Sequence, residues 1–324
     1  MFEIASTPIL KIDIQQIDLE DERYRISIQK NFSLLCQSIQ LMGVMTPPVI
    51  QEKASKYLVI SGFQRIYACK VIGMELIPCH VVSSDFSEHD CARWAIAENA
   101  SQRSLIPLEQ SRALRLIETI FPEKATVLAV AQQMGLPSTQ KAMHQIRPLC
   151  HMPQHIQDGI ANAYIAIPIA HALRHFSEND IRCVANLFKQ LNAGVNIQRE
   201  LLSTCDEIAK RDNKSVADIL NSDSVNSIMS KYADDRKQRI YYLRQYLKRL
   251  RYPTYTSVKS KVESSMKRLK LNAQTQLVPP PFFESDIWQI QINFINIKEL
   301  KHSLANVLSR TDAINTIISQ DIQI

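Results

Sequence analysis

Val59-Ile60-Ser61-Gly62-Phe63-Gln64-Arg65-Ile66-Tyr67-Ala68 is the stretch of this 324-residue chain that decides how its N-terminal part folds. An apolar, β-branched run breaks at Ser61-Gly62 and then continues with the periodicity of a helix, which predicts a strand that turns directly into a helix. A glycine at such a turn lets an anion approach the backbone, and the free N–H groups of the helix start can bind it. Arg65, in the first turn of that helix, adds a planar fork of donors suited to phosphate oxygens.

Strand and helix patterns alternate around this turn and predict a small α/β domain over residues 1–118. Strand character is seen in residues 10–20, 47–60 and 77–82, and helices are expected near 92–98 and 108–121. Residues 32–41 also form a helical pattern, with Phe32, Leu35, Ile39 and Met42 on one face.

The rest of the chain is mostly helical in pattern, so the predicted fold class is α+β. We expect an all-α domain over residues 119–211 and a basic helical segment over 212–278. The triple proline at 279–281 then predicts a stiff linker. A strictly alternating strand over 288–294 and an amphipathic helix bearing Leu300, Leu304, Val307 and Leu308 would form a C-terminal β–α unit over 279–324.

Residues 125–149 have the pattern of two helices joined by a tight turn, with Ala131 in the first helix and Gly135 at the turn. A plain helical hairpin would show the same pattern. In a DNA-binding helix-turn-helix, the second helix, near 139–145, would reach base edges, where Gln pairs with adenine and Lys with guanine or phosphate. The outward-facing candidates are Ser138, Thr139, Gln140, Lys141, His144 and Arg147.

Positive charge is concentrated in one segment. Residues 236–270 hold twelve basic residues and one acid, a local charge of +11, although the whole chain carries only +6. Five tyrosines lie among these cations. The excess favours a polyanionic partner, and Arg244, Lys248 and Arg249 are candidate DNA contacts. The alternative is a solvated basic helix whose tyrosines lie in a core.

Composition excludes several classes. The seven cysteines include no Cys-x-x-Cys, which favours reduced thiols, and the one adjacent Cys–His pair, Cys150-His151, has no second pair to complete a zinc site. We therefore predict no metal site among these residues. No apolar run approaches the roughly 20 residues that span a bilayer, and the N-terminus lacks the pattern of a secretory signal. We expect a cytoplasmic protein with no membrane partner.

The chain resembles the ParB partition-protein family over residues 10–175. Residues 60–68 are similar to that family's first box, a strand followed by G-E-R-R-x-x-A, and Leu35–Pro47 is similar to its S-I-x-x-x-G-x-x-x-P segment. Glu98-Asn99 with Leu105–Glu109 resembles the second box, E-N-x-x-R-x-x-L-x-P-x-E. Further on, Arg147-Pro148-Leu149 with Met152-Pro153 is similar to the family's L-R-L-L-x-L-P.

The resemblance implies a CTP site, with Mg²⁺, that closes two subunits into a clamp around DNA. The implied nucleotide residues are Thr46, Ser61, Gly62, Gln64, Arg65, Glu98, Asn99 and Arg103, of which Glu98 and Asn99 are also the candidates for catalysis of hydrolysis.

Three departures from the boxes predict weakened CTP binding and slow or absent hydrolysis. Phe63 replaces the family's acid, Gln64 replaces its first arginine, and Gln102 stands at the second-box arginine, with Arg103 one residue late. In a helix, that shift would rotate the side chain by about 100°.

The resemblance also implies a homodimer formed through the C-terminal unit, recognition of a short DNA site, and a ParA-type ATPase as partner. The alternative for the C-terminal unit is that it packs back on the helical domain of the same chain. The role would be plasmid or chromosome partition, with the protein associated with nucleoid or plasmid. Two alternatives stay open: a helix-turn-helix transcription regulator with a degenerate nucleotide fold, and an ATP-dependent enzyme similar to sulfiredoxins or free-serine kinases. Against the second, position 63 is Phe rather than a sulfiredoxin-type cysteine.

Overall fold

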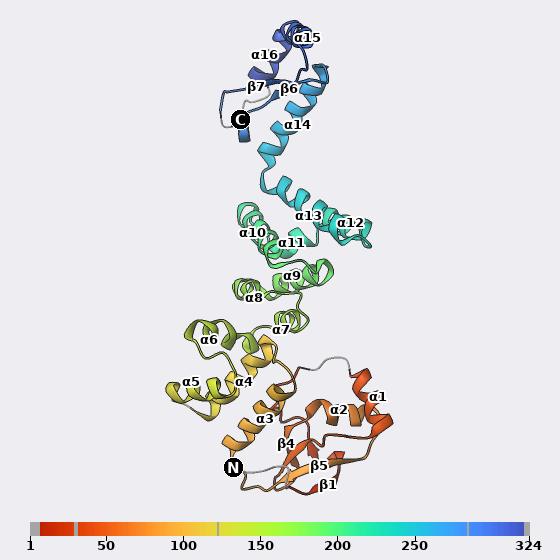
Figure 1. The fold of residues 1–324 in the computed structure, drawn as a ribbon, viewed down its shortest axis with the longest axis vertical. Coiled ribbons are helices and arrows are strands. Elements are labelled where there is room, and N and C mark those ends of the chain that lie inside the picture. Colours follow the sequence, from red (N-terminus) through yellow and green to blue (C-terminus); the bar gives the residue numbers. More distant parts are fainter. Residues whose placement is uncertain (1–6, 29–31, 122, 284, 321–324) are drawn as a thin grey trace. The chain divides into compact units, whose positions relative to one another are not determined.

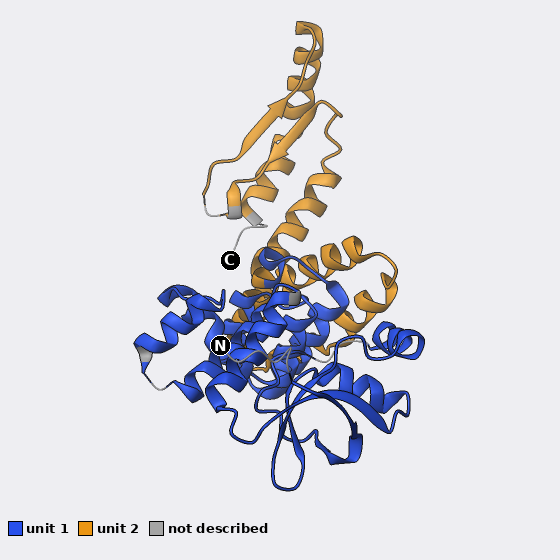
Figure 2. Ribbon diagram, turned by 60° about the horizontal axis from the view of Figure 1, so that its bottom comes forward, with its two compact units in different colours: residues 1–198 blue, residues 199–324 orange. Residues whose placement is uncertain are grey.

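The computed structural model describes residues 7–28, 32–121, 123–283 and 285–320. The chain divides into two compact units, residues 1–198 and residues 199–324 (Figure 2). The first combines a sheet with helices, and the second is largely helical with a small hairpin, so the predicted α+β fold class is confirmed. The four-part division expected from the sequence stays a prediction.

The first unit is built on a five-stranded mixed sheet in the order β1-β5-β3-β4-β2 (Figure 1). Strand β1 pairs antiparallel with β5, and β3 pairs antiparallel with β4, whereas β3–β5 and β2–β4 are parallel. The strands are β1 (Ile9–Asp13), β2 (Ile17–Asp18), β3 (Val49–Glu52), β4 (Tyr57–Ser61) and β5 (Leu76–Val82). The predicted strand 47–60 is therefore a hairpin of two strands.

This sheet is strongly curled. Its two edge strands, β1 and β2, are joined only by the short 3-10 turn η2 (Ile14–Gln16). The four residue steps from Asp13 to Ile17 span at most about 14 Å, whereas a flat sheet would separate its outer strands by about 19 Å, at 4.8 Å per strand spacing. The two edges must therefore approach each other.

Four helices complete the part of this unit that holds the predicted nucleotide residues. They are α1 (Ser33–Met42), α2 (Phe63–Val71), α3 (Glu88–Gln102) and α4 (Pro107–Ile120). Ile50, Ile60 and Ile77 of the sheet and Ile66 of α2 are fully buried, which fixes α2 on the sheet directly after β4. The predicted inward face of α1 is only partly right: Ile39 is buried, but Met42, at the helix end, is 69% exposed.

The remaining helices of the first unit follow in short steps. They are α5 (Lys124–Gln133), α6 (Gln140–Ile146), the 3-10 helix η3 (Arg147–His151), α7 (Gln154–Ala161), α8 (Ile167–Leu173) and α9 (Glu178–Leu191); α10 (Val195–Asp212) continues into the second unit. Buried Ser111 of α4 ties η3 down, because its hydroxyl donates to the Arg147 carbonyl and accepts from the Cys150 N–H, both at 2.9 Å. Helix α6 is thereby held against α4.

The second unit contains a hydrophobic core that the sequence reasoning did not foresee. Strand β6 (Thr275–Val278) was not predicted, yet it pairs antiparallel with β7 (Gln289–Ile292). Leu277 and Phe283 lie on either side of the triple proline and share one core with helices α14 and α16. The elements of this unit after α10 are α11 (Val216–Leu220), α12 (Asp223–Lys231), α13 (Arg236–Arg251), α14 (Pro253–Arg268), β6, the 3-10 helix η4 (Pro281–Phe283), β7, α15 (Ile297–Leu308) and α16 (Thr311–Gln320).

Helix α15 does not bury the whole apolar face predicted for it. Val307 packs against the core of the second unit, but Leu304 is 45% exposed and Leu308 is 72% exposed. No helix among the described residues has the length and apolar character needed to cross a bilayer.

Candidate nucleotide pocket and DNA-contact surface

A pocket of about 400 Å³ opens where β4 turns into α2. The start of α2, the end of α3, and the segments before β3 and after β2 all contribute to its lining. Seven of the eight predicted nucleotide residues line it, and the eighth, Ser61, lies buried next to Gly62. The lining residues are Ser27, Leu35, Thr46, Gly62, Phe63, Gln64, Arg65, Glu98, Asn99 and Arg103.

Gly62 caps α2 in a conformation that other residues rarely adopt, with φ +89°. A Cβ at this position would lie 2.7 Å from Pro48 Cβ and 2.9 Å from Pro48 Cα. Both the backbone angle and the close approach of Pro48 therefore require glycine. The first N–H groups of α2 have no partner within the helix, so this turn presents donors at the pocket.

Arg65 lies at the centre of the pocket and is held by several acceptors. Its guanidinium donates to the Thr46 carbonyl at 2.6 Å and to the Pro47 carbonyl at 3.3 Å, and it forms an ion pair with Glu98 of α3. Both side chains are largely buried, at 16% and 14% exposure. An anion entering this pocket would compete with Glu98 for the same guanidinium.

Arg103 reaches the pocket although it stands one position late in the second box. Helix α3 ends at Gln102, and Arg103 is its C-cap with extended backbone, φ −168° and ψ 161°. The expected 100° rotation therefore does not apply, because the residue is no longer helical. The side chain of Gln102, in contrast, lies outside what the structure describes.

Glu109 of α4 positions Arg103, and the sequence reasoning did not include it among the site residues. The carboxylate is 2% exposed and accepts from Arg103 Nη1 and from Arg103 Nη2 at 2.7 Å, as well as from the backbone N–H groups of Ile28 and Ile106. Burial by itself would raise the pKa of Glu109, but these hydrogen bonds lower it below its usual range. The sequence did indicate Glu109 in one way, because it is the last acid of the second box.

The residues that depart from the family boxes have structural roles here. Phe63 is 3% exposed and fills the core at the first position of α2. Gln64 donates its amide to the Ile28 carbonyl at 2.7 Å, which ties the α2 start to the segment after β2. Asn99, which matches the second box, donates to the Ala95 carbonyl of its own helix at 2.8 Å. The pocket thus combines two arginines, amide groups and a helix start, a set suited to a polyanion.

Buried thiols give no support to thiol chemistry in this fold. Burial raises the pKa of Cys69 and Cys91 to about 11 and that of Cys79 to about 12, so these thiols are protonated at neutral pH. No cluster of three His, Cys, Asp or Glu side chains suited to a metal ion occurs in the described ranges. The pocket itself holds one carboxylate, Glu98, so a Mg²⁺ ion there would need phosphate oxygens as further ligands.

Helices α5 and α6 form the predicted pair around a turn at Gly135, whose φ is +67°. Thr139 caps α6 by accepting from the Ala142 N–H, and Met143 and Ile146 bury the inner face. The predicted contact residues Thr139, Gln140, Lys141, His144 and Arg147 are exposed, and Ser138 is half-buried. Four of them, Ser138, Gln140, His144 and Arg147, line one hollow of about 680 Å³.

Arg147 is not free to contact DNA in this structure, because its guanidinium forms an ion pair with Glu118 of α4. Sequence reasoning missed Glu118, which is distant in the chain. The candidate contacts of the basic segment all lie on α13, in the second unit. Lys248 and Arg249 are exposed, whereas Arg244 is bound to Glu200 of α10 at 2.8 Å.

The fold and the pocket define an α/β domain with a strand-to-helix turn and two arginines at one pocket. Residues 3–100 match the family model of the ParB N-terminal domain. The recognition made from the sequence is thus confirmed: the N-terminal part of this chain belongs to the ParB N-terminal domain family.

Among curated relatives, the nucleoid occlusion protein of Shouchella clausii is 30% identical over 168 residues, covering 50% of this chain and 57% of the relative. That of Bacillus licheniformis is 27% identical over 206 residues, covering 61% and 70%. That of Listeria monocytogenes (strain HCC23) is 28% identical over 146 residues, covering 45% and 49%. The chain thus spans about half the length of the first of these relatives and of the Listeria protein.

Two solved structures of the C-terminally truncated chromosome-partitioning protein ParB from Caulobacter crescentus are also similar, each at 17% identity. The complex with CTP-gamma-S covers 56% of this chain and 98% of that chain. The complex with the centromeric parS site covers 58% and 95%. Both have a TM-score of 0.27.

Proposed function

We propose that this protein is a sequence-specific DNA-binding protein of the ParB type whose N-terminal pocket binds CTP and thereby controls clamping on DNA. One observation carries the proposal: the residues of two boxes more than thirty positions apart line a single pocket at a helix start, with Arg65 and Arg103 both present. A triphosphate would take Arg65 from Glu98 and contact the first N–H groups of α2. The nucleotide would then replace the Arg65–Glu98 ion pair as the link between the two box segments.

The DNA-binding part of the proposal is supported by the exposed outer face of α6. Gln140, Lys141 and His144 project from a short helix whose inner face is anchored by Met143 and Ile146. This is the arrangement in which a recognition helix offers its side chains to base edges in the major groove. Action on DNA in a nucleoid or on a plasmid, and an ATPase partner of the ParA type, belong to the same proposal.

Self-association through the C-terminal unit is supported by its exposed apolar side chains. Leu304 and Leu308 of α15, together with Ile290, Phe294 and Ile295 of β7 and the following turn, are between 45% and 92% exposed. A row of large apolar side chains left in water on one small unit is typical of an interface. A second copy of the chain would bury it symmetrically.

Direct titration with nucleotides tests the pocket. We expect the chain to bind CTP more tightly than ATP, GTP or UTP in calorimetry with Mg²⁺. Arg65→Gln removes a charged donor and should raise Kd about tenfold or more, since hydrogen bonds to charged groups contribute about 1.5–3 kcal/mol. Arg93→Gln, on an exposed position of α3 outside the pocket, should change Kd less than twofold and serves as the control. No CTP binding by the native chain would refute the nucleotide part.

Genome-wide occupancy tests the function. Chromatin immunoprecipitation should show a few sites with signal spreading over neighbouring DNA, and the spread should shrink to narrow peaks in the Arg65→Gln variant. Narrow scattered peaks that the substitution does not change would instead identify a transcription regulator with a relic pocket. ATP turnover without DNA, together with no enriched sites, would favour an enzyme.

A further inference from the structure

A second cavity, of about 700 Å³, lies within the second compact unit, residues 199–324, between α10 and α13. It shares no residue with the pocket of the N-terminal domain. Its size falls in the range of small-ligand sites. Leu201 and Leu247, both at most 2% exposed, lie among its lining residues, and Thr204 adds a hydroxyl group.

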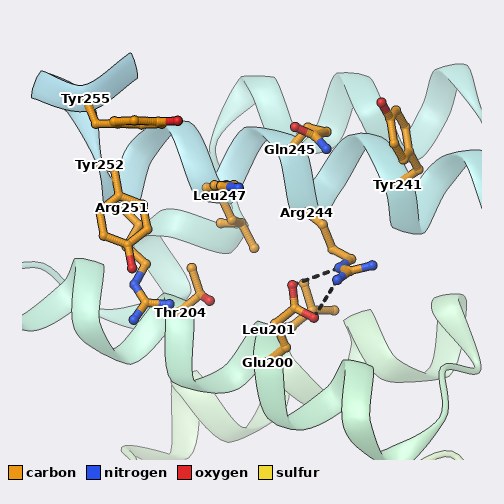
Figure 3. Close-up of a pocket in the computed structure, with 11 residues that line it drawn as sticks. Glu200, Leu201, Thr204, Tyr241, Arg244, Gln245, Leu247, Arg251, Tyr252 and Tyr255 are labelled. Carbon is orange, nitrogen blue, oxygen red and sulfur yellow. Dashed lines mark hydrogen bonds and ion pairs between the residues drawn. The ribbon is translucent and has the colours of Figure 1, made fainter. Parts of the chain in front are cut away.

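Tyrosine rings stand at both ends of this cavity (Figure 3). Tyr252 and Tyr255 lie at one end and Tyr241 at the other, with Arg244 and Gln245 between them. Tyr241 is 57% exposed and Tyr252 is 43% exposed. Tyr241 makes a T-shaped contact with Tyr242, and the Arg251 guanidinium lies over one face of the Tyr252 ring at 5.0 Å, so a ligand base would cover the exposed remainder of each ring. Tyr241 lies in α13 and Tyr252 is the C-cap of that helix, eleven positions further on, which corresponds to roughly 16 Å along the helix axis.

The charge between the rings is positive. Three lining cations, Arg244, Lys248 and Arg251, face one lining carboxylate, Glu200. Glu200 holds Arg244 through two contacts of 2.8 Å, and Glu207 holds Arg251 at 2.6 Å. Lys248 forms no ion pair with any described residue. Its ammonium group is therefore available to an anion without displacing a glutamate.

We infer that this cavity binds two nucleobases joined through a phosphate, one base against Tyr241, the other against Tyr252, and the phosphate at Lys248. Tyrosine faces bind bases of any sequence by stacking, and interleaved cations hold the backbone between them. Duplex DNA does not fit this arrangement, because its base faces are already stacked on one another. Single-stranded nucleic acid and a free dinucleotide share the required chemistry.

The experiment is a titration of the full chain, by fluorescence anisotropy, with labelled oligothymidylate and, in parallel, with the dinucleotide pTpT. We expect both probes to bind, and we expect Tyr241→Leu to weaken binding about fivefold or more. Tyr242 is unsuitable as a control, because its ring makes a T-shaped contact with the Tyr241 ring at 5.2 Å. Tyr232→Leu is the control: Tyr232 does not line the cavity, and its ring stacks on Tyr242 rather than on Tyr241. Lys248→Ala should weaken binding more than Lys237→Ala, which removes an equal charge from the same helix outside the cavity.

The outcomes distinguish a single strand from a free dinucleotide as the ligand, and both from an acidic polypeptide. Binding of oligothymidylate alone, with the Tyr241 dependence, assigns the site to single strands, whereas equal binding of pTpT assigns it to a dinucleotide. Equal losses in the Tyr241 and Tyr232 variants would overturn the inference, as would loss of binding in Arg65→Gln but not in Tyr241→Leu. A Tyr241-dependent affinity for polyglutamate as strong as that for oligothymidylate would also overturn it, since the site would then recognise an acidic polypeptide. Thermal unfolding of each variant verifies that it folds.

Discussion

Replacement of Gly62 by alanine tests whether the strand-to-helix turn is as constrained as its geometry indicates. The new methyl group would lie 2.7 Å from Pro48 Cβ and 2.9 Å from Pro48 Cα, and the residue would keep φ near +89°. Pro48 Cα is a backbone atom next to β3, so it cannot rotate away as a flexible side chain would. Either the turn or the start of β3 must therefore shift.

The expected cost has two parts. A left-handed conformation costs a residue with a Cβ about 1–2 kcal/mol, and an extra methyl group in a packed site costs about 1–3 kcal/mol. Together they give about 2–5 kcal/mol of lost stability. For a unit of this size, each kcal/mol lowers Tm by roughly 2–4 °C. Gly73 offers a matched control, because its φ is +78° but nothing lies within 4 Å of its Cβ position.

The measurement is urea unfolding followed by tryptophan fluorescence. The chain has two tryptophans, Trp94 in the first unit and Trp288 in the second, so a Trp288→Phe background reports the first unit alone. In that background Gly73→Ala should show the conformational cost only, about 1–2 kcal/mol. Gly62→Ala should exceed it by a further 1 kcal/mol or more, roughly the packing cost. Equal losses in the two variants would show that Pro48 does not constrain the turn.

Three further predictions concern charges and the exposed helix. The pKa of Glu109 is lowered in the folded protein, so its stabilising contribution is complete above its unfolded pKa of about 4.3 and disappears as the pH falls through the folded pKa. Glu109→Gln should therefore lower the free energy of unfolding in urea by about 1.5–3 kcal/mol at pH 7 but by much less near pH 3. A loss that does not depend on pH would contradict this. Glu118→Gln should release Arg147, tighten DNA binding and steepen its salt dependence by about one phosphate contact in anisotropy titrations, whereas an unchanged slope would mean that Arg147 does not reach the backbone. Leu304→Lys should raise the dissociation constant of self-association, measured by sedimentation, about tenfold or more, because apolar burial is lost. His302→Lys, at an exposed polar position of the same helix, should leave this constant unchanged. If both variants sediment like the native chain, the interface lies elsewhere.

Local patterns in the sequence predicted the elements that depend on neighbouring residues. The break at Ser61-Gly62 predicted the junction of β4 and α2, and apolar spacing predicted α1 and α5. The family boxes supplied the eight predicted nucleotide residues, and the structure brings seven of them to one pocket with Ser61 beside it. Only the rotation of about 100° expected for Arg103 was wrong, because α3 ends at Gln102 and a helix end is poorly determined by periodicity.

Features that depend on distant residues could not be predicted in this way. Strand β6 is four residues long and stands before three prolines, and only its pairing with β7 makes it a strand. The ion pair of Arg147 with Glu118 joins positions 29 apart and exists because η3 is fastened to α4 through Ser111. The exposure of Met42 follows from its place at the end of α1, beyond the stretch that packs on α2.

The curled sheet of the N-terminal domain has a consequence for solubility. An open sheet offers two rows of unpaired N–H and C=O groups, on which strands of other molecules can assemble into aggregates. Here the short turn η2 brings β1 and β2 toward each other, and β2 has only two residues. Neither edge therefore presents a long, flat template. If copies of the protein gather on DNA, as the proposed function requires, these edges would not join the sheets of neighbouring copies.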